Sequence, residues 1–551
     1  MKTFSWGAPV LAKYGQLGEW HLPGPSRVTS SSYKRTAMHL RRLSLVTFAA
    51  PLLFASCSSD SDSNAGNPAQ TPFGGSAPSS QNANPQQPAE MANNPAESSS
   101  ESTTPDVGST PNNETQVSTE TPLQPGDTAG PSGATPGDTA APGDTAAPGD
   151  TAVPPVVSGS PFAPIGTVEN RGVDCQVGAL PAGNTLPRSA NLPDPFTKLD
   201  GTRITQKSDW VCRRQEILRQ VNQYIYGEKP LKPASVTGTV TNTQVTVNVQ
   251  QNGQTASFTA AVTLPAGQQG PVPAIISYGG NAGVTAIVSA MGVAVINYNQ
   301  GSVGSRNTGI YSRLYPNNTS GDLAAWAWGA SRIIDVLQAA GNTVIDSSKL
   351  AVTGCSFLGK AALATGAMDE RIALVIPRES GIGGVPAYRI VPQIEPNPTN
   401  SGTGPEQPQH AIDSGWLPAN SLVNDPQRLP VDTHEILGLV APRGLLVLGN
   451  TGGQAQNYLN LDFHTEYASA VAGSQIFAAL GIQDRLSYDS RNVTHCDAGT
   501  GYTGAIQASV NRFLLGRAAT TGRFDTDFEG IRTAPDQFVQ WTAPTLEGDL
   551  P

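Results

Sequence analysis

Residues 350–362 read LAVTGCSFLGKAA, which is an apolar run, then a serine between glycines, then small residues. This order predicts a buried strand, a tight turn and a helix. Gly354 permits a turn in which a Cβ would clash, and Gly359 allows the helix to pack closely. Ser356 falls at the apex, where its hydroxyl is exposed and the helix N-terminus favours developing negative charge. The stretch is typical of a nucleophile elbow.

The spacing of the glycines leaves two interpretations of Ser356. It is Gly-x-Ser-x-x-Gly, whereas Gly-x-Ser-x-Gly is the more common elbow motif. A serine in a turn of small residues is more often a helix cap than a nucleophile. The choice between the two depends on whether a base and an acid are found elsewhere in the chain.

Composition divides the 551 residues into a globular and a non-globular part. Residues 58–165 consist mostly of Ser, Thr, Pro, Gly, Asn and Ala, and the unit Pro-Gly-Asp-Thr-Ala repeats near their end. Such a segment buries too little apolar surface to offset its conformational entropy, which predicts a disordered linker. Its twelve acidic residues more than account for the net charge of −10. The acidity therefore says nothing about the substrate, and no basic patch indicates nucleic acid.

Residues 1–57 predict an export signal with an upstream extension, in which Met38 is the expected start. Arg41 and Arg42 precede an apolar run over 43–55, and small residues follow. The ending resembles a bacterial lipobox, so Cys57 is the expected lipidated residue and the outer membrane the expected location. An ordinary signal peptide and secretion are the alternative. The apolar run is too short to span a bilayer.

Residues 166–551 predict one α/β domain. Alternating apolar runs within 236–264, with Asn252-Gly253 between two of them, indicate antiparallel hairpins. Continuous apolar strands are expected at 273–278, 293–298, 350–354, 373–377, 445–448 and 485–488, and helices at 209–226, 322–337, 357–368, 467–480 and 506–515. This alternation favours a mostly parallel sheet with helices on both faces, a three-layer sandwich. With a serine elbow in mid-chain, it is the organisation of an α/β-hydrolase.

A serine nucleophile requires a histidine base that an acid orients. The chain has six histidines, and only His495 lies on the loop after the last predicted strand, where the chain order Ser, acid, His requires it. A surface-loop histidine is the alternative interpretation of this residue.

Two residues compete for the role of the acid. Glu379 lies at the carboxyl end of the strand after the elbow helix. The more usual position follows the next strand, where Asn450 stands and Asp462 is the nearest acid. We favour Glu379, for which a solvated turn carboxylate is the alternative.

Five cysteines in an exported chain indicate disulfides. If Cys57 is lipidated, three pairings remain possible among the other four. These are Cys175, Cys212, Cys355 and Cys496. A Cys355–Cys496 bridge would tie the residue before the predicted nucleophile to the residue after the predicted base. It would leave the other two to join the N-terminal strap to the first helix.

Several motifs together resemble the glucuronoyl esterases, carbohydrate esterase family 15. They are Gly354-Cys355-Ser356 with Gly359-Lys360, Ile376-Pro377-x-Glu379-Ser380-Gly381, His495-Cys496, Asn191–Phe196, Asp209–Cys212, Ala325–Asp335 and Ala441–Arg443. The resemblance covers about residues 170–516 and shows no large insertions, so the chain is similar to the compact, fungal-type members.

The resemblance implies hydrolysis of esters between a 4-O-methyl-glucuronate carboxyl on xylan and a lignin alcohol. It implies a triad of Ser356, Glu379 and His495, and no metal or cofactor. It also implies the disulfides Cys175–Cys212 and Cys355–Cys496.

The resemblance further implies substrate contacts. Lys360 is expected to contact the sugar hydroxyls. The acid and tryptophan of the family's binding loop correspond to Asp413 and Trp416, and a substrate-facing aromatic residue corresponds to Tyr458.

One departure from the family concerns the oxyanion. The family usually has arginine directly after the nucleophile, where this chain has Phe357. We expect the backbone N–H of Phe357 and the loop containing Gly280 to supply donors, and Arg378 to compensate for the missing guanidinium.

Two other functions stay open at this point. One is an esterase of different specificity, because Phe357 makes that wall of the pocket apolar. The other is a non-catalytic carbohydrate-binding relative with the same fold. For either function the chain is expected to be a monomer, and the linker would give an anchored domain reach toward an insoluble substrate.

Overall fold

The structure is a computed structural model that describes residues 167–280, 282–305, 307–394, 406–451, 463–527 and 535–550. The predicted export signal, Cys57 and almost the whole predicted linker lie outside these residues, as do Tyr458 and Asp462. Among the described residues, no helix combines the length and the apolar character needed to cross a bilayer.

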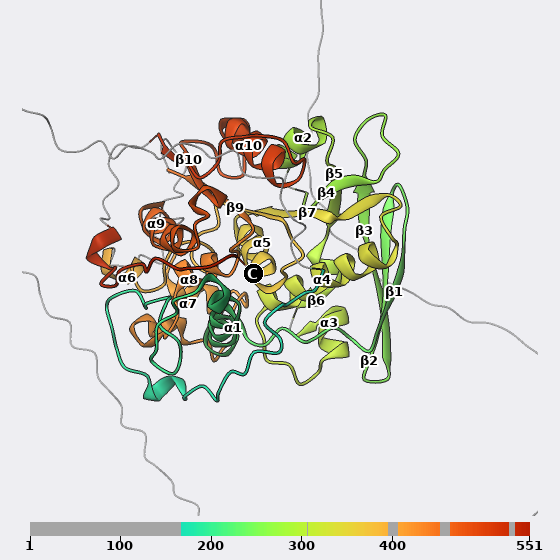
Figure 1. Ribbon diagram of the computed structural model, residues 1–551. Helices are drawn as coiled ribbons and strands as arrows, with labels where there is room; N and C mark the ends of the chain where they lie inside the picture. Colours follow the sequence, from blue (N-terminus) through green and yellow to red (C-terminus); the bar gives the residue numbers. More distant parts are fainter. Residues whose placement is uncertain are drawn as a thin grey trace, which may run out of the picture. The chain divides into compact units, whose positions relative to one another are not determined.

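One sheet of ten strands runs through the described part, in the order β1-β2-β3-β5-β4-β7-β8-β9-β10-β11 (Figure 1). The strands are β1 (Ser235–Val240), β2 (Gln244–Gln251), β3 (Gln254–Thr263), β4 (Val272–Tyr278), β5 (Ala294–Tyr298), β7 (Ile345–Cys355), β8 (Leu374–Arg378), β9 (Gly444–Asn450), β10 (Leu486–Arg491) and β11 (Phe524–Thr526); β6 (Gly304–Ser305) lies outside the sheet.

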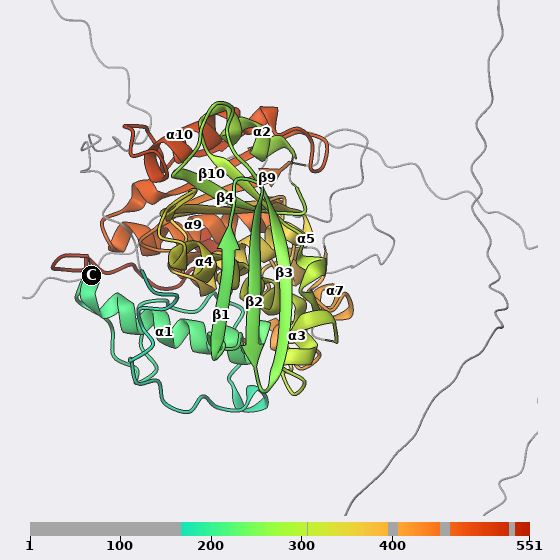
Figure 2. The same ribbon diagram turned by 90° about the vertical axis from the view of Figure 1, so that its right-hand side faces the viewer.

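The first three strands form an antiparallel extension, seen face-on in Figure 2. Asn252 and Gly253 connect β2 to β3 with φ values of 50° and 72°. Positive φ at both positions is the geometry of the favoured two-residue hairpin turn, so the predicted hairpin is confirmed. β3 then pairs antiparallel with β5.

All remaining neighbours in the sheet pair in parallel, as expected from the continuous apolar strands. The short strand β11 was not predicted, because its three residues, Phe-Asp-Thr, carry no apolar run. It pairs with β10 along the edge. The loop that carries His495 therefore follows β10 and not the last strand of the chain.

Helices cover both faces of the sheet (Figure 1). They are α1 (Trp210–Val221), α2 (Ala282–Ala290), α3 (Gly309–Leu314), α4 (Asp322–Ala339), α5 (Phe357–Met368), α6 (Val391–Ile394), α7 (Pro408–Asp413), α8 (Thr433–Gly438), α9 (Phe463–Ala479) and α10 (Thr503–Phe513). Helices α2 and α10 pack on one face, and α4, α5, α8 and α9 pack on the other.

Successive strand residues alternate between two apolar cores, because side chains point to opposite faces of a strand. Ile275 and Ala351 belong to the core under α2 and α10, whereas Ile276 and Val352 belong to the larger core on the other face. The three-layer α/β-hydrolase architecture is thus confirmed.

The turn between β7 and α5 depends on two glycines. A Cβ at Gly354 would lie 2.2 Å from the carbonyl oxygen of Leu358, and one at Gly359 would lie 2.4 Å from that of Arg378. Both distances are far below van der Waals contact. The sequence requires glycine here because the helix passes directly against the neighbouring backbone.

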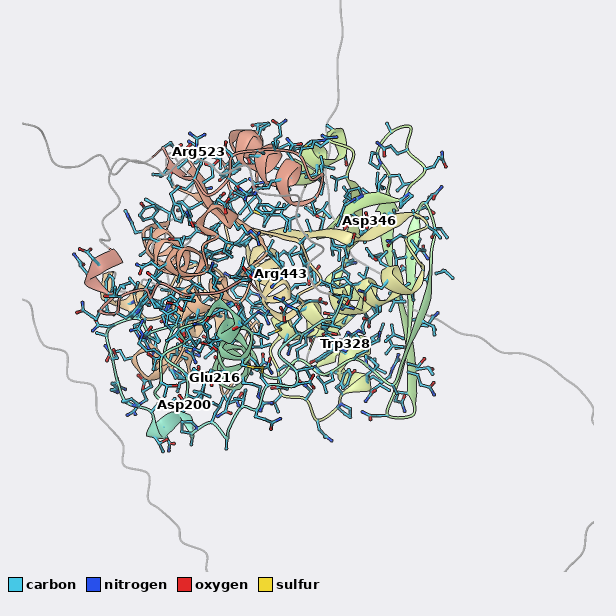
Figure 3. All side chains as sticks on the ribbon, in the orientation of Figure 1. Asp200, Glu216, Trp328, Asp346, Arg443 and Arg523 are labelled. Carbon is cyan, nitrogen blue, oxygen red and sulfur yellow. A yellow bond between two sulfur atoms is a disulfide. The ribbon has the colours of Figure 1, made fainter. Side chains whose placement is uncertain are left out.

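The C-terminal end of α5 is fixed by the buried Arg443, which Figure 3 labels in the interior. Its guanidinium donates to the carbonyl oxygen of Gly366 in α5 at 2.6 Å and to that of Leu439, after α8, at 2.9 Å. It also binds the carbonyls of Asp369 and Ile372. These donors satisfy helix-end carbonyls that would otherwise be buried without a partner.

We expect Gly359→Ala to lower the free energy of unfolding by about 1–3 kcal/mol, because the added methyl group must displace the backbone of β8. Urea unfolding of the two proteins measures the difference. Gly504→Ala in α10 is the matched control, since a Cβ there meets nothing within 4 Å. The control should be neutral or more stable by up to about 1 kcal/mol. Equal effects of the two substitutions would contradict the close approach.

Candidate active site

Ser356 stands at the junction of β7 and α5 in a backbone conformation that L-residues rarely adopt, with φ 60° and ψ −131°. Its N–H donates to the carbonyl of Arg378 at 3.0 Å, which fixes the turn on the adjacent strand. No described N–H of α5 donates a capping hydrogen bond to its hydroxyl. Local strain without a cap argues for the nucleophile interpretation of this serine.

Glu379 and His495 form a hydrogen-bonded pair. Nδ1 of His495 lies 2.7 Å from Oε2 of Glu379. The same oxygen accepts from the backbone N–H of Cys496 at 2.9 Å and from Nδ2 of Asn450 at 3.2 Å. The carboxylate is fully buried. Glu379 is therefore oriented as the partner of His495 and is not a solvated turn carboxylate.

The surroundings of Glu379 keep it ionised. Burial raises the pKa of its carboxyl, but the hydrogen bond from His495, the charge of Arg378 and the donors on Cys496 and Asn450 outweigh burial and hold the pKa below its ordinary value. An ionised partner at Nδ1 fixes the imidazole so that Nε2 is the nitrogen available for proton transfer.

The described residues contain two disulfides, and both pairings implied by the resemblance are confirmed. Cys175 is joined to Cys212, and Cys355 to Cys496, with Cα–Cα distances of 5.4 and 5.8 Å. The second bridge ties the residue before Ser356 to the residue after His495. It holds the two predicted catalytic segments together covalently.

The ligand-type atoms of Cys355, Glu379, His495 and Cys496 all lie within 4.8 Å of one another. The two sulfur atoms are bonded to each other and are not thiolates, and the other two groups bind each other. We therefore assign this cluster to the disulfide and the acid–base pair and not to a metal.

The turn after β4 lies beside the elbow. Gly279 and Gly280 have φ values of 62° and 67°. A Cβ at Gly279 would lie 2.5 Å from Cδ1 of Leu358. This places the turn beside the first turn of α5, and the assignment of Gly280 as an oxyanion donor stays a prediction.

The expected role of Arg378 as an oxyanion donor is wrong. Its fully buried guanidinium donates from Nε to Oε1 of Glu379 at 2.7 Å, which is the oxygen that does not bind His495. Nη1 and Nη2 donate to the carbonyl oxygen and to Oδ1 of Asp497 at 2.9 and 2.5 Å. Arg378 is the last residue of β8, and its positive charge lies against the carboxylates of Glu379 and Asp497.

Phe357 belongs to a row of aromatic rings. Its side chain is 37% exposed, one of the few large apolar side chains exposed in the described part. Its ring is parallel to that of Trp416, with 6.1 Å between the centroids, and its centroid is also 6.1 Å from that of Trp326. The residue after Ser356 thus gives the site an uncharged aromatic wall.

Lys360 also contacts Trp416. Its buried ammonium donates to the carbonyl of Ser380 at 2.6 Å and to Oε2 of Glu406 at 2.8 Å, and it lies 4.5 Å from the centroid of the Trp416 ring. Burial lowers the pKa of the ammonium, although Glu406 opposes the shift. Lys360 and Trp416 are therefore in contact, and the expected role of both in substrate binding stays a prediction.

Asp413 is not brought to this cluster. It is exposed and accepts a hydrogen bond from Gln409 on its own helix at 2.8 Å. The carboxylate beside Lys360 belongs to Glu406. Glu406 could not be recognised in the sequence, because it stands among glycine, proline and polar residues without periodicity.

Asn450 is a second residue that was missed. Its amide group donates to Glu379 and also to the carbonyl oxygen of Val493 at 3.0 Å. In the sequence this position is distinguished only by the absence of an acid where α/β-hydrolases usually have one. Asn450, at the carboxyl end of β9, therefore does not act as the acid itself. Its amide group orients Glu379, which follows the neighbouring strand β8.

The fold and the oriented acid–base pair define an α/β-hydrolase of the serine-hydrolase type. A family model described as "Glucuronyl esterase, fungi" matches residues 247–481. A 4-O-methyl-glucuronoyl methylesterase from Hypocrea jecorina is 34% identical over 381 residues, which are 67% of this chain and 79% of that protein. One from Podospora anserina is 36% identical over 405 residues, 71% and 80% of the two chains.

Solved structures agree with these relatives. A glucuronoyl esterase variant from Sporotrichum thermophile, in complex with methyl 4-O-methyl-β-D-glucopyranuronate, superposes with a TM-score of 0.60 at 33% identity over 66% of this chain and 97% of that one. A family 15 glucuronoyl esterase from Caldicellulosiruptor kristjansonii gives 0.56 at 30% identity over 66% and 99%. This chain belongs to the glucuronoyl esterase family and is a carboxylic ester hydrolase.

The two candidates for the acid can be separated by substitution. We expect Glu379→Gln to lower kcat for a chromogenic ester by roughly 10³–10⁴-fold, because the amide cannot stabilise the imidazolium that forms. Asp462→Asn is the control and should change kcat by less than about twofold. The opposite pattern would assign the acid to Asp462.

Proposed function

We propose that this chain hydrolyses esters of glucuronic acid, and of its 4-O-methyl derivative on xylan, with lignin-type alcohols. The observation that carries the proposal is the Glu379–His495 pair, bridged to the Ser356 elbow, in a chain about one-third identical to proteins named 4-O-methyl-glucuronoyl methylesterase. The complex of the Sporotrichum thermophile relative with a methyl glucuronate ester supports the same substrate class.

The proposed mechanism begins with attack by Ser356. Nε2 of His495 takes the proton of the serine hydroxyl as Oγ bonds to the ester carbonyl carbon. The backbone N–H groups of Phe357 and Gly280 hold the resulting oxyanion. His495 then gives the proton to the leaving alkoxide, and the alcohol departs. Water repeats the sequence on the acyl-enzyme and releases the uronic acid, while Glu379 stabilises the imidazolium in both steps.

The polar half of the site would recognise the sugar. Lys360 supplies charged donors, Glu406 supplies acceptors, and Trp416 supplies an apolar face, all fixed in place by one another. A small number of convergent polar groups beside an apolar surface is the usual construction of a pocket for a small polar ligand.

Hydrolysis of benzyl glucuronate by the wild type and by Ser356→Ala tests the proposal. We expect turnover in the wild type and a loss of at least about 10⁴-fold in the variant. An organophosphonate that labels Ser356 would exclude a non-catalytic binding protein. A folded protein that neither turns over the ester nor reacts at Ser356 would overturn the proposal.

Phe357 favours a second possibility, an esterase with a broader preference at the same site. Its uncharged ring stands where the family usually has a charged donor for the oxyanion. If the oxyanion lacks a donor, Phe357→Arg should raise kcat for benzyl glucuronate by roughly tenfold or more. Phe357→Leu is the control for loss of the ring. An unchanged or lower kcat in Phe357→Arg would show that other groups already supply the donors.

We also propose that the chain is exported and anchored through a lipid on Cys57, with residues 58–165 as a tether. The basic, apolar and small-residue order before Cys57 supports this proposal. We expect Cys57→Ser to move the protein from the membrane fraction to the soluble fraction and to abolish labelling by radioactive palmitate. Retention of the label would contradict the assignment.

A further inference from the structure

Three consecutive residues of the loop after β10 are each tied to the ends of neighbouring strands. His495 binds Glu379 through its side chain. Cys496 binds Glu379 through its N–H and Cys355 through the disulfide. Asp497 binds Arg378 through both its carboxylate and its carbonyl oxygen. The loop that carries the base is thus held by a covalent tie and by an ionic tie.

We propose that Arg378 is a positioning residue that bridges Glu379 and Asp497, holds the His495 loop against the acid and limits the pull of the acid on the imidazolium. This inference rests on the proposed function of the site. It assigns a role to a side chain that touches neither Ser356 nor the pocket in any described contact, whereas the backbone carbonyl of Arg378 accepts from the N–H of Ser356.

The guanidinium of Arg378 is a buried charge with two carboxylate partners. The guanidinium is fully buried and lies between two carboxylates, with 2.7 Å to Oε1 of Glu379 and 2.5 Å to Oδ1 of Asp497. Its carbon lies 5.3 Å from the centroid of the Tyr502 ring. The hydroxyl of Tyr502 donates to the carbonyl of Gly449 at 2.6 Å, which fixes the ring. Removing one partner would leave a buried charge unpaired, which is costly.

Asp497 is itself held in the loop. Its N–H donates to the carbonyl oxygen of Thr494 at 3.0 Å, and its Oδ1 accepts from the N–H of Gly499 at 2.7 Å. The ionic tie therefore acts on a preformed turn that begins beside His495. Because only two peptide bonds separate Asp497 from His495, a contact that holds Asp497 also restrains His495.

The bridge also sets the electrostatics of the acid. Arg378 binds one oxygen of Glu379, and His495 binds the other. The other groups that face the carboxylate are the amide of Asn450 on β9 and the N–H of Cys496, and Tyr502 packs against the guanidinium. Because the guanidinium neutralises part of the carboxylate charge, less negative charge faces the imidazole. Removal of the guanidinium would stabilise the protonated base, so activity would be lost at a higher pH on the acid side.

Arg378→Gln tests both parts of the proposal. We expect kcat to fall by roughly tenfold to a hundredfold with KM little changed, because the base is displaced and the sugar contacts are not. We expect the acid limb of kcat/KM to move upward by roughly one pH unit. Arg378→Lys keeps the charge and should restore the position of the limb, but not the whole of kcat, because it lacks the fork geometry.

Arg371→Gln is the matched control. Arg371 is another buried arginine, and it lies between Asp369 and Asp335 at 2.7 and 2.6 Å, in contact with none of the triad residues. This variant should lower the melting temperature without moving the acid limb. An unshifted limb in Arg378→Gln, or an equal shift in both variants, would overturn the electrostatic role.

Reduction of the disulfides tests the redundancy of the two ties. Cys496 is exposed, so dithiothreitol can reach the Cys355–Cys496 bridge. We expect the reduced wild type to retain most of its activity and the reduced Arg378→Gln variant to lose at least about another tenfold. Equal fractional losses in the two proteins would contradict a shared clamp.

The choice of substrate separates this inference from the proposed function. All measurements are made with benzyl glucuronate and with 4-nitrophenyl acetate. Turnover of the acetate alone would refute the uronate specificity. The acid limb of kcat/KM and the response to dithiothreitol could then still be measured with the acetate. The clamp is therefore confirmed or refuted whichever ester the enzyme prefers.

Discussion

The hydrogen bond between Nδ1 of His495 and Oε2 of Glu379, 2.7 Å long, is the contact on which the site depends. It joins residues 116 positions apart, and it forms because parallel pairing brings the carboxyl ends of β8, β9 and β10 to one edge. The close approach of α5 to β8, which Gly359 permits, sets the elbow against the same edge. Three donors on one buried oxygen then hold the acid in a single orientation.

The parts of the fold that depend on neighbouring residues in the chain could be predicted from the sequence. The elbow could be predicted from its glycines, at which a Cβ would clash, and the parallel strands from their continuous apolar runs. The resemblance supplied the disulfide pairing and supported Glu379 as the acid, which its position after a strand already favoured. Glu406 and the true direction of Arg378 could not be predicted, because each depends on which distant group a long side chain meets after folding. The position of Asp413 was wrong for the same reason: its helix turns it toward solvent.

The described site combines a polar cluster and an aromatic wall, and Trp416 contacts both. A buried ammonium, a carboxylate and a carbonyl oxygen form the polar cluster around Lys360. Phe357 and Trp326 form the uncharged wall next to the nucleophile. A polar sugar and an apolar alcohol are the two parts of the proposed ester.

The central claim is that Ser356 attacks the carbonyl of a glucuronate ester with His495 as its base. The most direct measurement is mass spectrometry of the protein after exposure to a phosphonate analogue of a glucuronate ester. We predict one adduct per chain, on the peptide containing Ser356, formed more slowly in the presence of methyl glucuronate and not formed in His495→Ala. An adduct on another residue, or no adduct on folded protein, would contradict the claim.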